Sequence, residues 1–261
     1  MIFQTVLQDL RIGLRVLIKE KSFCALAITV ISLGICAVTT QFAVVNGVFL
    51  RGLAFPHPGE LVEVQMVDPI DFKPSNFKAR VTTADYAELK AQQLSFAGFA
   101  ASLPGSTVNL TYKGMPQRLR GAYVSNDFFR MLGVAPALGR DFLPEDDQPG
   151  IDKAVILSDA LWKRDFGGDA RVIGQTVRVN GRAGSVIGVM PPKFTFPANE
   201  QVWLPINTEF PVRPRNDRNI NTVNIIGRLK PGVSPEQANA EMMALATQFA
   251  AGEAAVHPKN P

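Results

Sequence analysis

Residues 22–50 read SFCALAITVISLGICAVTTQFAVVNGVFL and contain no charged side chain. A helix of this length, rising about 1.5 Å per residue, would be roughly 43 Å long and would exceed the roughly 30 Å hydrocarbon core of a bilayer. A cleaved signal peptide has a shorter apolar region. A lipoprotein signal carries a small residue before its cysteine, whereas Ile35 precedes Cys36. The sequence therefore predicts an uncleaved transmembrane helix over 23–50.

The flanking charges predict the orientation of this segment. Four basic residues precede it (Arg11, Arg15, Lys19 and Lys21), whereas Arg51 is the nearest basic residue behind it. Because the side of a span that is richer in Lys and Arg stays in the cytoplasm, we expect a cytoplasmic N-terminus. Residues 51–261 would then lie outside the cytoplasm.

Residues 1–22 are predicted to form a cytoplasmic amphipathic helix. Apolar side chains recur at spacings of three and four, at Phe3, Leu7, Leu10, Leu14 and Leu17. Such a helix can lie on the inner leaflet with its basic face towards anionic lipid. It can also dock a cytoplasmic partner, and the two interpretations are compatible.

Composition argues against two classes of protein for the exported region, disulfide-stabilised scaffolds and nucleic-acid-binding proteins. The two cysteines, Cys24 and Cys36, both lie in the apolar segment, so a disulfide scaffold is excluded beyond it. The formal net charge is +4, and the Lys and Arg residues form no dense run. A nucleic-acid-binding protein normally concentrates these residues on one face or helix, so we expect no nucleic-acid partner.

The exported region shows local signals of a mixed fold. Strands are predicted over 61–67, 96–112, 154–157, 176–189 and 222–229, the fourth interrupted by an Asn-Gly turn at 180–181. Helices are predicted to begin after the capping residues Thr82, Ser125, Ser158 and Ser234. Gly133 and Gly167 would end two of these helices. The order of elements predicts an α+β domain in two lobes, with a β-rich block inserted between two βα units.

The sequence indicates no site of bond chemistry. It lacks a Walker-type phosphate loop, a nucleophile elbow and the HExxH zinc motif. The two histidines, His57 and His257, are far apart in sequence, so a histidine-dependent triad or zinc site is not expected. We interpret residues 145–147 (EDD) as a solvated acidic loop rather than a calcium site. No catalytic, cofactor-binding or metal residue is therefore assigned, and no cofactor is expected.

Aromatic residues near the predicted helices are expected to fill the core. Trp162 lies on the helix after Ser158, and Phe128 and Phe129 precede Gly133. Large aromatic side chains in such positions bury apolar area more often than they bind a ligand.

Four blocks in order resemble one known family. They are LQDLRIGLRVLIKEKSFCALAITVISLGI with FAVVNGVFLRGLAFPHPGELV, SNDFFRMLGVAPALGRDFLPEDD, AVILSDALWKRDFGGDARVIGQTVRVNGRAGSVIGVMPPKFTFP, and GRLKPGVSPEQANAEM. Together they resemble the MacB-like periplasmic core domain of FtsX-type ABC transporter permeases, of the duplicated-permease type. Gly52 and Ala54 stand where the family usually has prolines in the loop that leaves the membrane.

The resemblance implies an architecture and a place in the cell. A porter-like βα lobe over about 51–136 and 211–261 would be interrupted by a smaller α/β lobe over about 137–210. The chain would lie in the bacterial inner membrane with its main domain in the periplasm. Relative to the family it is expected to be incomplete at its C-terminus, where family members continue with a closing strand and three more spans.

The resemblance also implies a function without catalysis by this chain. The chain would be the N-terminal portion of a permease in an ABC-type export or mechanotransmission complex, and not an enzyme. Its expected partners are a cytoplasmic ABC ATPase subunit, the remaining permease spans or a second permease subunit, a periplasmic adaptor protein and the lipid bilayer. The alternatives are a stand-alone anchored binding module, an inactive permease fragment and, ranked below these, a membrane-tethered hydrolase.

Overall fold

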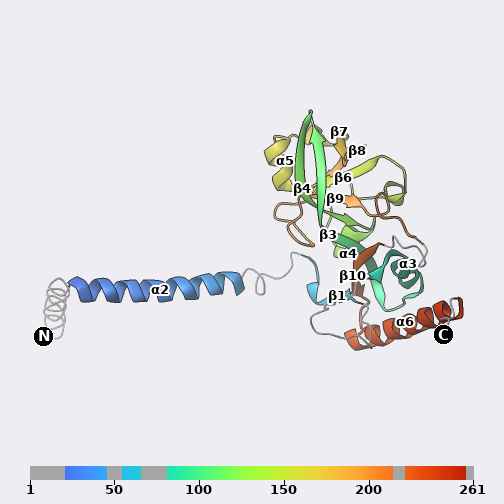
Figure 1. Ribbon diagram of the computed structural model, residues 1–261, viewed down its shortest axis with the longest axis horizontal. Helices are drawn as coiled ribbons and strands as arrows, with labels where there is room; N and C mark the ends of the chain where they lie inside the picture. The colour runs from blue at the N-terminus through green and yellow to red at the C-terminus, as the bar shows by residue number, and fades with distance from the viewer. Residues whose placement is uncertain (1–20, 46–54, 66–80, 214–220, 257–261) are drawn as a thin grey trace, which may run out of the picture. The chain divides into compact units, whose positions relative to one another are not determined.

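The computed structural model describes residues 21–45, 55–65, 81–213 and 221–256 (Figure 1). Residues 1–54 and 55–261 form two separate units. In the first unit, helix α2 (Lys21–Val45) covers most of the predicted span over 23–50. None of the helices in the described ranges combines the length and the hydropathy needed to cross a bilayer. The amphipathic helix predicted over 1–22 falls on residues that, apart from the last two, lie outside the described ranges.

One half of the second unit, which we name the βα half, is built from a small antiparallel sheet and two helices. Strand β10 (Thr222–Leu229) lies between β1 (Leu61–Val64) and β3 (Phe96–Tyr112), and it also pairs with β2 (Val81–Thr82). Helices α3 (Thr83–Gln92) and α6 (Pro235–Val256) lie side by side (Figure 1). The Glu241 carboxylate of α6 accepts hydrogen bonds from the backbone N–H groups of Leu94 and Ser95, just after α3, at 2.5 and 2.9 Å.

A long hairpin connects this half to the rest of the domain. Strand β3 pairs with β4 (Met115–Val124) around a two-residue turn, in which Lys113 and Gly114 have φ angles of +49° and +79°. A hairpin turn of this kind needs positive φ at both central residues. The pairing continues past a bulge between Leu103 and Ser106, so β3 contributes to both halves of the sheet.

The strand pairings of the second half close on themselves. Strand β4 pairs with β9 (Val202–Pro205), β9 with β6 (Lys153–Leu157), and β6 with β8 (Arg182–Val189). Strand β8 then pairs with β7 (Thr176–Val179), which pairs back onto β3 through Leu110 and Thr111. We name this closed arrangement the strand ring. Two of its six strands, β3 and β4, come from outside the predicted 137–210 range.

Shorter elements complete the two halves of the second unit. They are the helices α4 (Phe128–Leu132) and α5 (Asp159–Asp165), the 3-10 turns η2 (Pro58–Glu60), η3 (Pro144–Asp147) and η4 (Ala170–Val172), and the two-residue strand β5 (Leu138–Gly139), which pairs with β8.

Alternation along each strand divides the core into two clusters. On β6, Val155 and Leu157 belong to a cluster that fills the ring and extends to α3 and α6 of the βα half. Ile156 belongs to a second cluster on the outer face of β6. Successive side chains of a strand point to opposite faces, and both faces of β6 are covered. The outer cluster collects the aromatic residues Phe55, Phe128, Phe129, Phe142, Phe194 and Trp203. The expectation that Phe128 and Phe129 fill the core is confirmed.

Close packing inside the ring requires a glycine at position 121 of β4. A Cβ atom at Gly121 would lie 2.7 Å from a methyl of Val108 and 2.8 Å from a methyl of Val202. Real Cβ contacts are longer, so any side chain here would push neighbouring ring strands apart.

Three of the four predicted helix caps are confirmed. The side-chain oxygens of Thr82, Ser158 and Ser234 accept hydrogen bonds from backbone N–H groups in the first helical turn, at 3.1, 3.2 and 3.3 Å. The prediction for Ser125 is wrong, because α4 starts after Asp127 and the Ser125 hydroxyl accepts from the Ala101 N–H instead.

The predicted Asn-Gly turn is confirmed. Asn180 and Gly181 have φ angles of +50° and +82° between β7 and β8. This pair of conformations belongs to the tight turn that matches the twist of two antiparallel strands.

Replacing Thr82 by alanine is expected to lower the free energy of unfolding by about 1 kcal/mol. The hydroxyl accepts from the Asp85 N–H at 3.1 Å and donates to the Asp85 carboxylate at 2.5 Å, and alanine removes both contacts. Urea unfolding followed by circular dichroism measures the change. Thr82→Ser keeps the hydroxyl and should retain most of the stability; an equal loss in both variants would contradict the capping role.

Candidate functional site

A pocket with a volume of about 360 Å³ lies where α3 and β10 of the βα half meet loops that follow strands of the ring. We name it the junction pocket, and it is lined by Thr83, Tyr86, Ala87, Lys90, Ala91, Ser125, Asn126, Asp147, Ile206, Asn207, Val212 and Val223. Volumes of this size hold small-molecule ligands in other proteins.

Two local features bring the walls of the pocket together. Strands β4 and β9 run parallel, so their carboxyl ends meet at one edge and place residues 125–126 beside 206–207. The Ile206 N–H donates to the Val124 carbonyl at 2.9 Å and fixes this junction. The opposite wall is one face of α3, because Thr83, Ala87 and Lys90 follow one another at helical spacing. Carboxyl ends of parallel strands are a recurrent place for ligand sites.

Lys90 is held by a chain of polar contacts at one end of the pocket. Its ammonium group donates to Asp127 Oδ2 at 2.7 Å and to the Tyr86 hydroxyl at 3.0 Å. The Ser125 hydroxyl donates to the other Asp127 oxygen at 2.8 Å. Burial alone would lower the pKa of Lys90, but the nearby Tyr86 and Asp127 outweigh it and raise that pKa above its ordinary value. Lys90 is therefore a fixed positive charge already balanced by Asp127.

Asp147 also lines the pocket, and its hydrogen bonds come from amides. Its Oδ1 accepts from the Asn207 backbone N–H at 2.7 Å, and its Oδ2 accepts from the Asn207 side-chain amide at 3.1 Å. The residue is 4% exposed, and burial raises the pKa of its carboxyl to about 6. A carboxylate without a cationic contact keeps much of its desolvation cost.

This arrangement corrects the interpretation of residues 145–147 as a solvated acidic loop. The segment forms η3, and its last residue, Asp147, turns inwards to bind Asn207. Asp146 pairs with Arg140, whose guanidinium contacts both carboxylate oxygens at 2.5 and 2.9 Å. The local sequence contains only a run of acids, so the partner 60 residues away could not be predicted from it.

The buried carboxyl predicts a dependence of stability on pH. The pKa of Asp147 is about 6 in the folded state and near its ordinary value in the unfolded state, so between these values the folded state holds the extra proton. Stability is therefore largest below the unfolded pKa and falls as the pH rises through the folded pKa. We expect the free energy of unfolding to fall by about 2 kcal/mol through this group between about pH 4 and pH 7.

Urea unfolding of the wild type and of Asp147→Asn across this range isolates the contribution of Asp147. Burial also raises the pKa of Asp141 to about 6, but that group titrates in both proteins and cancels in the difference. A difference that stays constant with pH would contradict the assignment.

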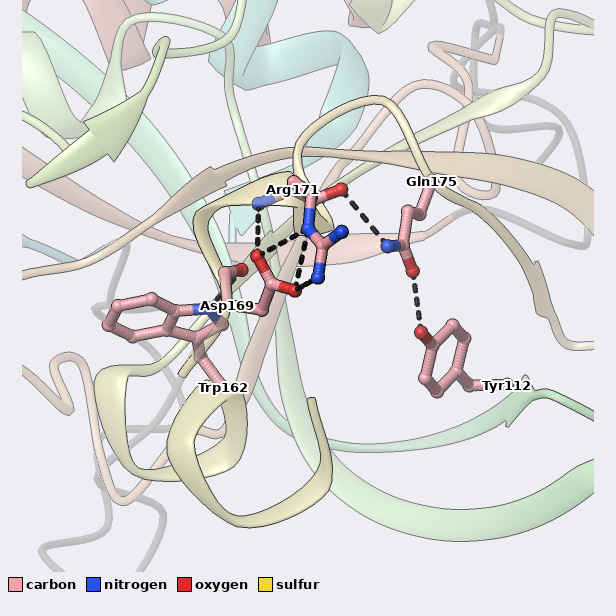
Figure 2. Close-up of polar contacts among 5 residues, drawn as sticks. All are labelled: Tyr112, Trp162, Asp169, Arg171 and Gln175. Atoms are coloured by element: carbon pink, nitrogen blue, oxygen red, sulfur yellow. Dashed lines mark hydrogen bonds and ion pairs between the residues drawn. The ribbon is translucent and has the colours of Figure 1, made fainter. Parts of the chain in front are cut away.

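A second hollow, of about 480 Å³, lies against η4 and the end of β3. Four of its polar residues, Tyr112, Asp169, Arg171 and Gln175, are linked by hydrogen bonds and an ion pair (Figure 2). The Tyr112 hydroxyl donates to Gln175 Oε1 at 2.6 Å, and the Gln175 amide donates to the Arg171 carbonyl at 3.0 Å. Arg171 Nη2 contacts Asp169 at 2.6 Å, and the Trp162 indole donates to the Asp169 carbonyl at 2.9 Å. These contacts stabilise a turn, so the junction pocket is the better candidate site.

The remaining residues singled out in the sequence lie elsewhere. His57 precedes η2 with a φ of +50°, and His257 lies outside the described residues. Trp162 packs against the ring core, in agreement with the expectation. Within the described ranges, no group of three or more His, Cys, Asp or Glu side chains is placed to hold a metal ion.

Comparison with known proteins identifies the family of this fold. The sequence profile of the MacB-like periplasmic core domain matches residues 24–245. The chain belongs to this family. The match starts inside α2 and includes the βα half, the ring and the start of α6, so the domain described above is a MacB-like periplasmic core domain.

Among characterised relatives, the chain is 29% identical over 173 residues to the macrolide export ATP-binding/permease protein MacB of Hahella chejuensis. The match covers 64% of this chain and 25% of that protein, so the chain spans about a quarter of the length of this relative.

Two solved structures share the MacB-like fold. One is a domain of a protein described as a permease from Porphyromonas gingivalis, with a TM-score of 0.56 and 19% identity over 74% of this chain and 86% of that one. The other is the periplasmic region of MacB from Actinobacillus actinomycetemcomitans, with a TM-score of 0.53 and 17% identity over 72% and 83%. These similarities support the mixed α+β fold.

Proposed function

We propose that this chain is the N-terminal portion of an ABC-type permease, in which a MacB-like periplasmic core domain moves in response to ATP hydrolysis by a separate cytoplasmic subunit. The observation that carries the proposal is the family match over residues 24–245. It joins the apolar N-terminal segment and the folded domain in one continuous unit of sequence. The chain itself would perform no bond chemistry.

Membrane attachment is part of this proposal. The apolar segment over 23–50 would anchor the chain, with residues 1–22 in the cytoplasm and residues 51–261 in the periplasm of a bacterial cell. Seven large apolar side chains of α2 are 61–67% exposed, namely Leu26, Ile28, Val30, Ile31, Leu33, Ile35 and Val38. Exposed apolar surface of this extent favours contact with lipid or with other apolar helices.

The architecture supports transmission of movement rather than catalysis. Both hydrophobic clusters contain residues from the porter-like range and from the 137–210 range, such as Phe99 with Val155 and Phe129 with Trp203. A shared close-packed core resists continuous deformation, so a force applied at the membrane would move the two lobes together or switch them between discrete packings. The porter-like lobe and the inserted lobe would thus move as one rigid body or change their packing in a discrete step.

Affinity purification of the tagged chain from its own membranes tests this function. Recovery of an ABC ATPase, or of a chain that carries further permease spans, is the expected result. Leu33→Arg serves as a disabling variant, because a charge in the middle of a membrane span costs about 3 kcal/mol. Leu94→Arg, at a side chain 74% exposed in the folded domain, is the matched control. Recovery of neither partner from well-folded, membrane-bound protein would contradict the permease assignment.

The junction pocket favours a second candidate function, a membrane-anchored binding module. Its volume of about 360 Å³ and its mixed polar and apolar lining are those of a ligand site. A chain that copurifies with no transport subunit but binds a ligand would fit this alternative.

A further inference from the structure

The charges around the junction pocket do not cancel. Lys90 and Asp127 form an ion pair at 2.7 Å, so their charges balance each other. Asp147 is bound by Asn207 amide donors, and the described residues offer it no cation within ion-pair distance. Lys90, Asp127 and Asp147 together therefore carry one net negative charge when Asp147 is ionised, although Asp127 lies outside the lining. The charge of Lys90 also acts on Asp147 from a distance and offsets part of the rise that burial causes in its pKa. A buried carboxylate in this state gains from a cationic partner more than from any neutral one.

The rest of the lining is suited to an apolar group. Ala87 and Ala91 of α3 line the pocket together with Ile206, Val212 and Val223. The small alanine side chains leave the space that bulkier residues would fill. A bound molecule can therefore bury carbon atoms here, and removing them from water favours binding.

The lining also contains a buried hydroxyl group without a hydrogen-bond partner among the described residues. Thr83 is 3% exposed, and its hydroxyl oxygen forms no hydrogen bond within the described part of the chain. Buried hydroxyl groups are normally paired, because leaving one unpaired costs stability. Thr83 lines the pocket together with Asp147, so its hydroxyl is a second group that a donor on a ligand could satisfy.

We propose that the junction pocket binds a small organic cation, a protonated amine carried on a short apolar group. The ammonium group would lie against the Asp147 carboxylate, and the apolar group would pack against Ala87, Ala91 and Val223. The lining of this site lies within residues 83–212 and at Val223, so the proposal does not rest on the permease assignment.

Other ligand chemistries fit the lining less well. An anion would need a free positive charge, but the Lys90 ammonium already donates to Asp127 and Tyr86. A hard metal cation needs about six oxygen ligands, and the described residues contain no cluster of three potential metal-binding side chains. A single buried carboxylate with apolar surroundings is instead the arrangement that suits one ammonium group.

Three probes of similar shape and different charge test the proposal: 2-phenylethylamine, 2-phenylethanol and 3-phenylpropionate. Saturation-transfer NMR with the full chain in neutral detergent measures their affinities. At about pH 7.5 the amine should bind about tenfold more tightly than the alcohol, because a hydrogen bond to a charged group is the stronger one. At about pH 5 the preference should shrink, because Asp147 then takes up a proton. Equal binding of all three probes, or preference for the propionate, would overturn the proposal.

Two variants separate this site from non-specific binding to detergent or protein. Asp147→Asn should abolish the preference for the amine over the alcohol, since it removes the charge. Ala87→Leu should weaken the amine and the alcohol alike, because it fills the apolar space, whereas Gln92→Leu on the exposed face of α3 should change neither. An amine preference that survives in folded Asp147→Asn would also overturn the proposal, and the urea midpoint of each variant shows that it is folded.

This test is independent of the copurification experiment. Binding of the amine without recovery of a transport subunit would leave the site in place and contradict the permease assignment alone. Recovery of a subunit without binding of the amine would support the permease assignment and contradict the binding site alone.

Discussion

Replacing Phe129 by alanine is expected to lower the free energy of unfolding by about 4 kcal/mol. The ring is fully buried, and its centroid lies 5.9 Å from that of Phe142, 5.7 Å from Phe194 and 5.8 Å from Trp203. Alanine would lose these contacts and leave a cavity that the neighbouring aromatic rings, already packed against one another, could fill only in part.

Tryptophan fluorescence follows the urea unfolding, and Trp203, which contacts the substituted ring, contributes to it together with Trp162. Leu94→Ala is the matched control, because this side chain is 74% exposed and its removal should change stability by less than about 0.5 kcal/mol. A loss below about 2 kcal/mol in Phe129→Ala would show that the outer cluster contributes little to stability.

The second large loss of stability is expected from a substitution that leaves a buried charge unpaired. Lys153 lies on β6 with a fully buried side chain, and its ammonium group donates a hydrogen bond to the Glu209 carboxylate. The ammonium nitrogen also lies 6.0 Å from the centre of the Tyr123 ring. Glu209→Gln removes the compensating negative charge and is expected to cost about 3 kcal/mol, because it leaves Lys153 buried and unpaired.

Substitution of the lysine itself should cost much less. Lys153→Met removes the buried charge and keeps a chain of similar length, while the Glu209 side chain, 35% exposed, can still be hydrated. We expect a change of about 1 kcal/mol or less, and a double variant close to Lys153→Met. Urea unfolding of the three variants forms a complete cycle. If Glu209→Gln lowered the free energy of unfolding no more than Lys153→Met, leaving the buried lysine unpaired would carry no extra penalty, and the prediction would be wrong.

Much of the local structure could be predicted because its causes are local. Thr82, Ser158 and Ser234 begin helices since a side-chain oxygen reaches an N–H group of the next turn. The Asn-Gly pair at 180–181 makes a hairpin because both residues tolerate positive φ. Ser125 shows the limit of such signals, since its hydroxyl is used by Ala101 on a neighbouring strand.

The candidate site could not be predicted in the same way. Asp147 belongs to an acidic run that reads as solvated, and its burial depends on Asn207, which arrives beside it only when β9 joins the sheet. For Lys153 a weak signal exists, because it shares the period-two face of Val155 and Leu157 at the start of β6. That alternation places the side chain inside the ring, but only Glu209 makes a charge there tolerable.

The sequence by itself determined the family and most of the elements in their order, although β4 and β9 were not among the predicted strands. Alternating apolar residues, capping side chains and turn residues act over a few positions, and the order of blocks is read directly from the chain. Tertiary structure alone decided that β7 pairs with β3, at Leu110 with Val179, and so closes the ring. It also decided that Asp147 and Lys90 line one pocket. The physical reason is that these contacts join residues distant in the chain, whose free energy of pairing and burial depends on the whole packed domain rather than on any local pattern.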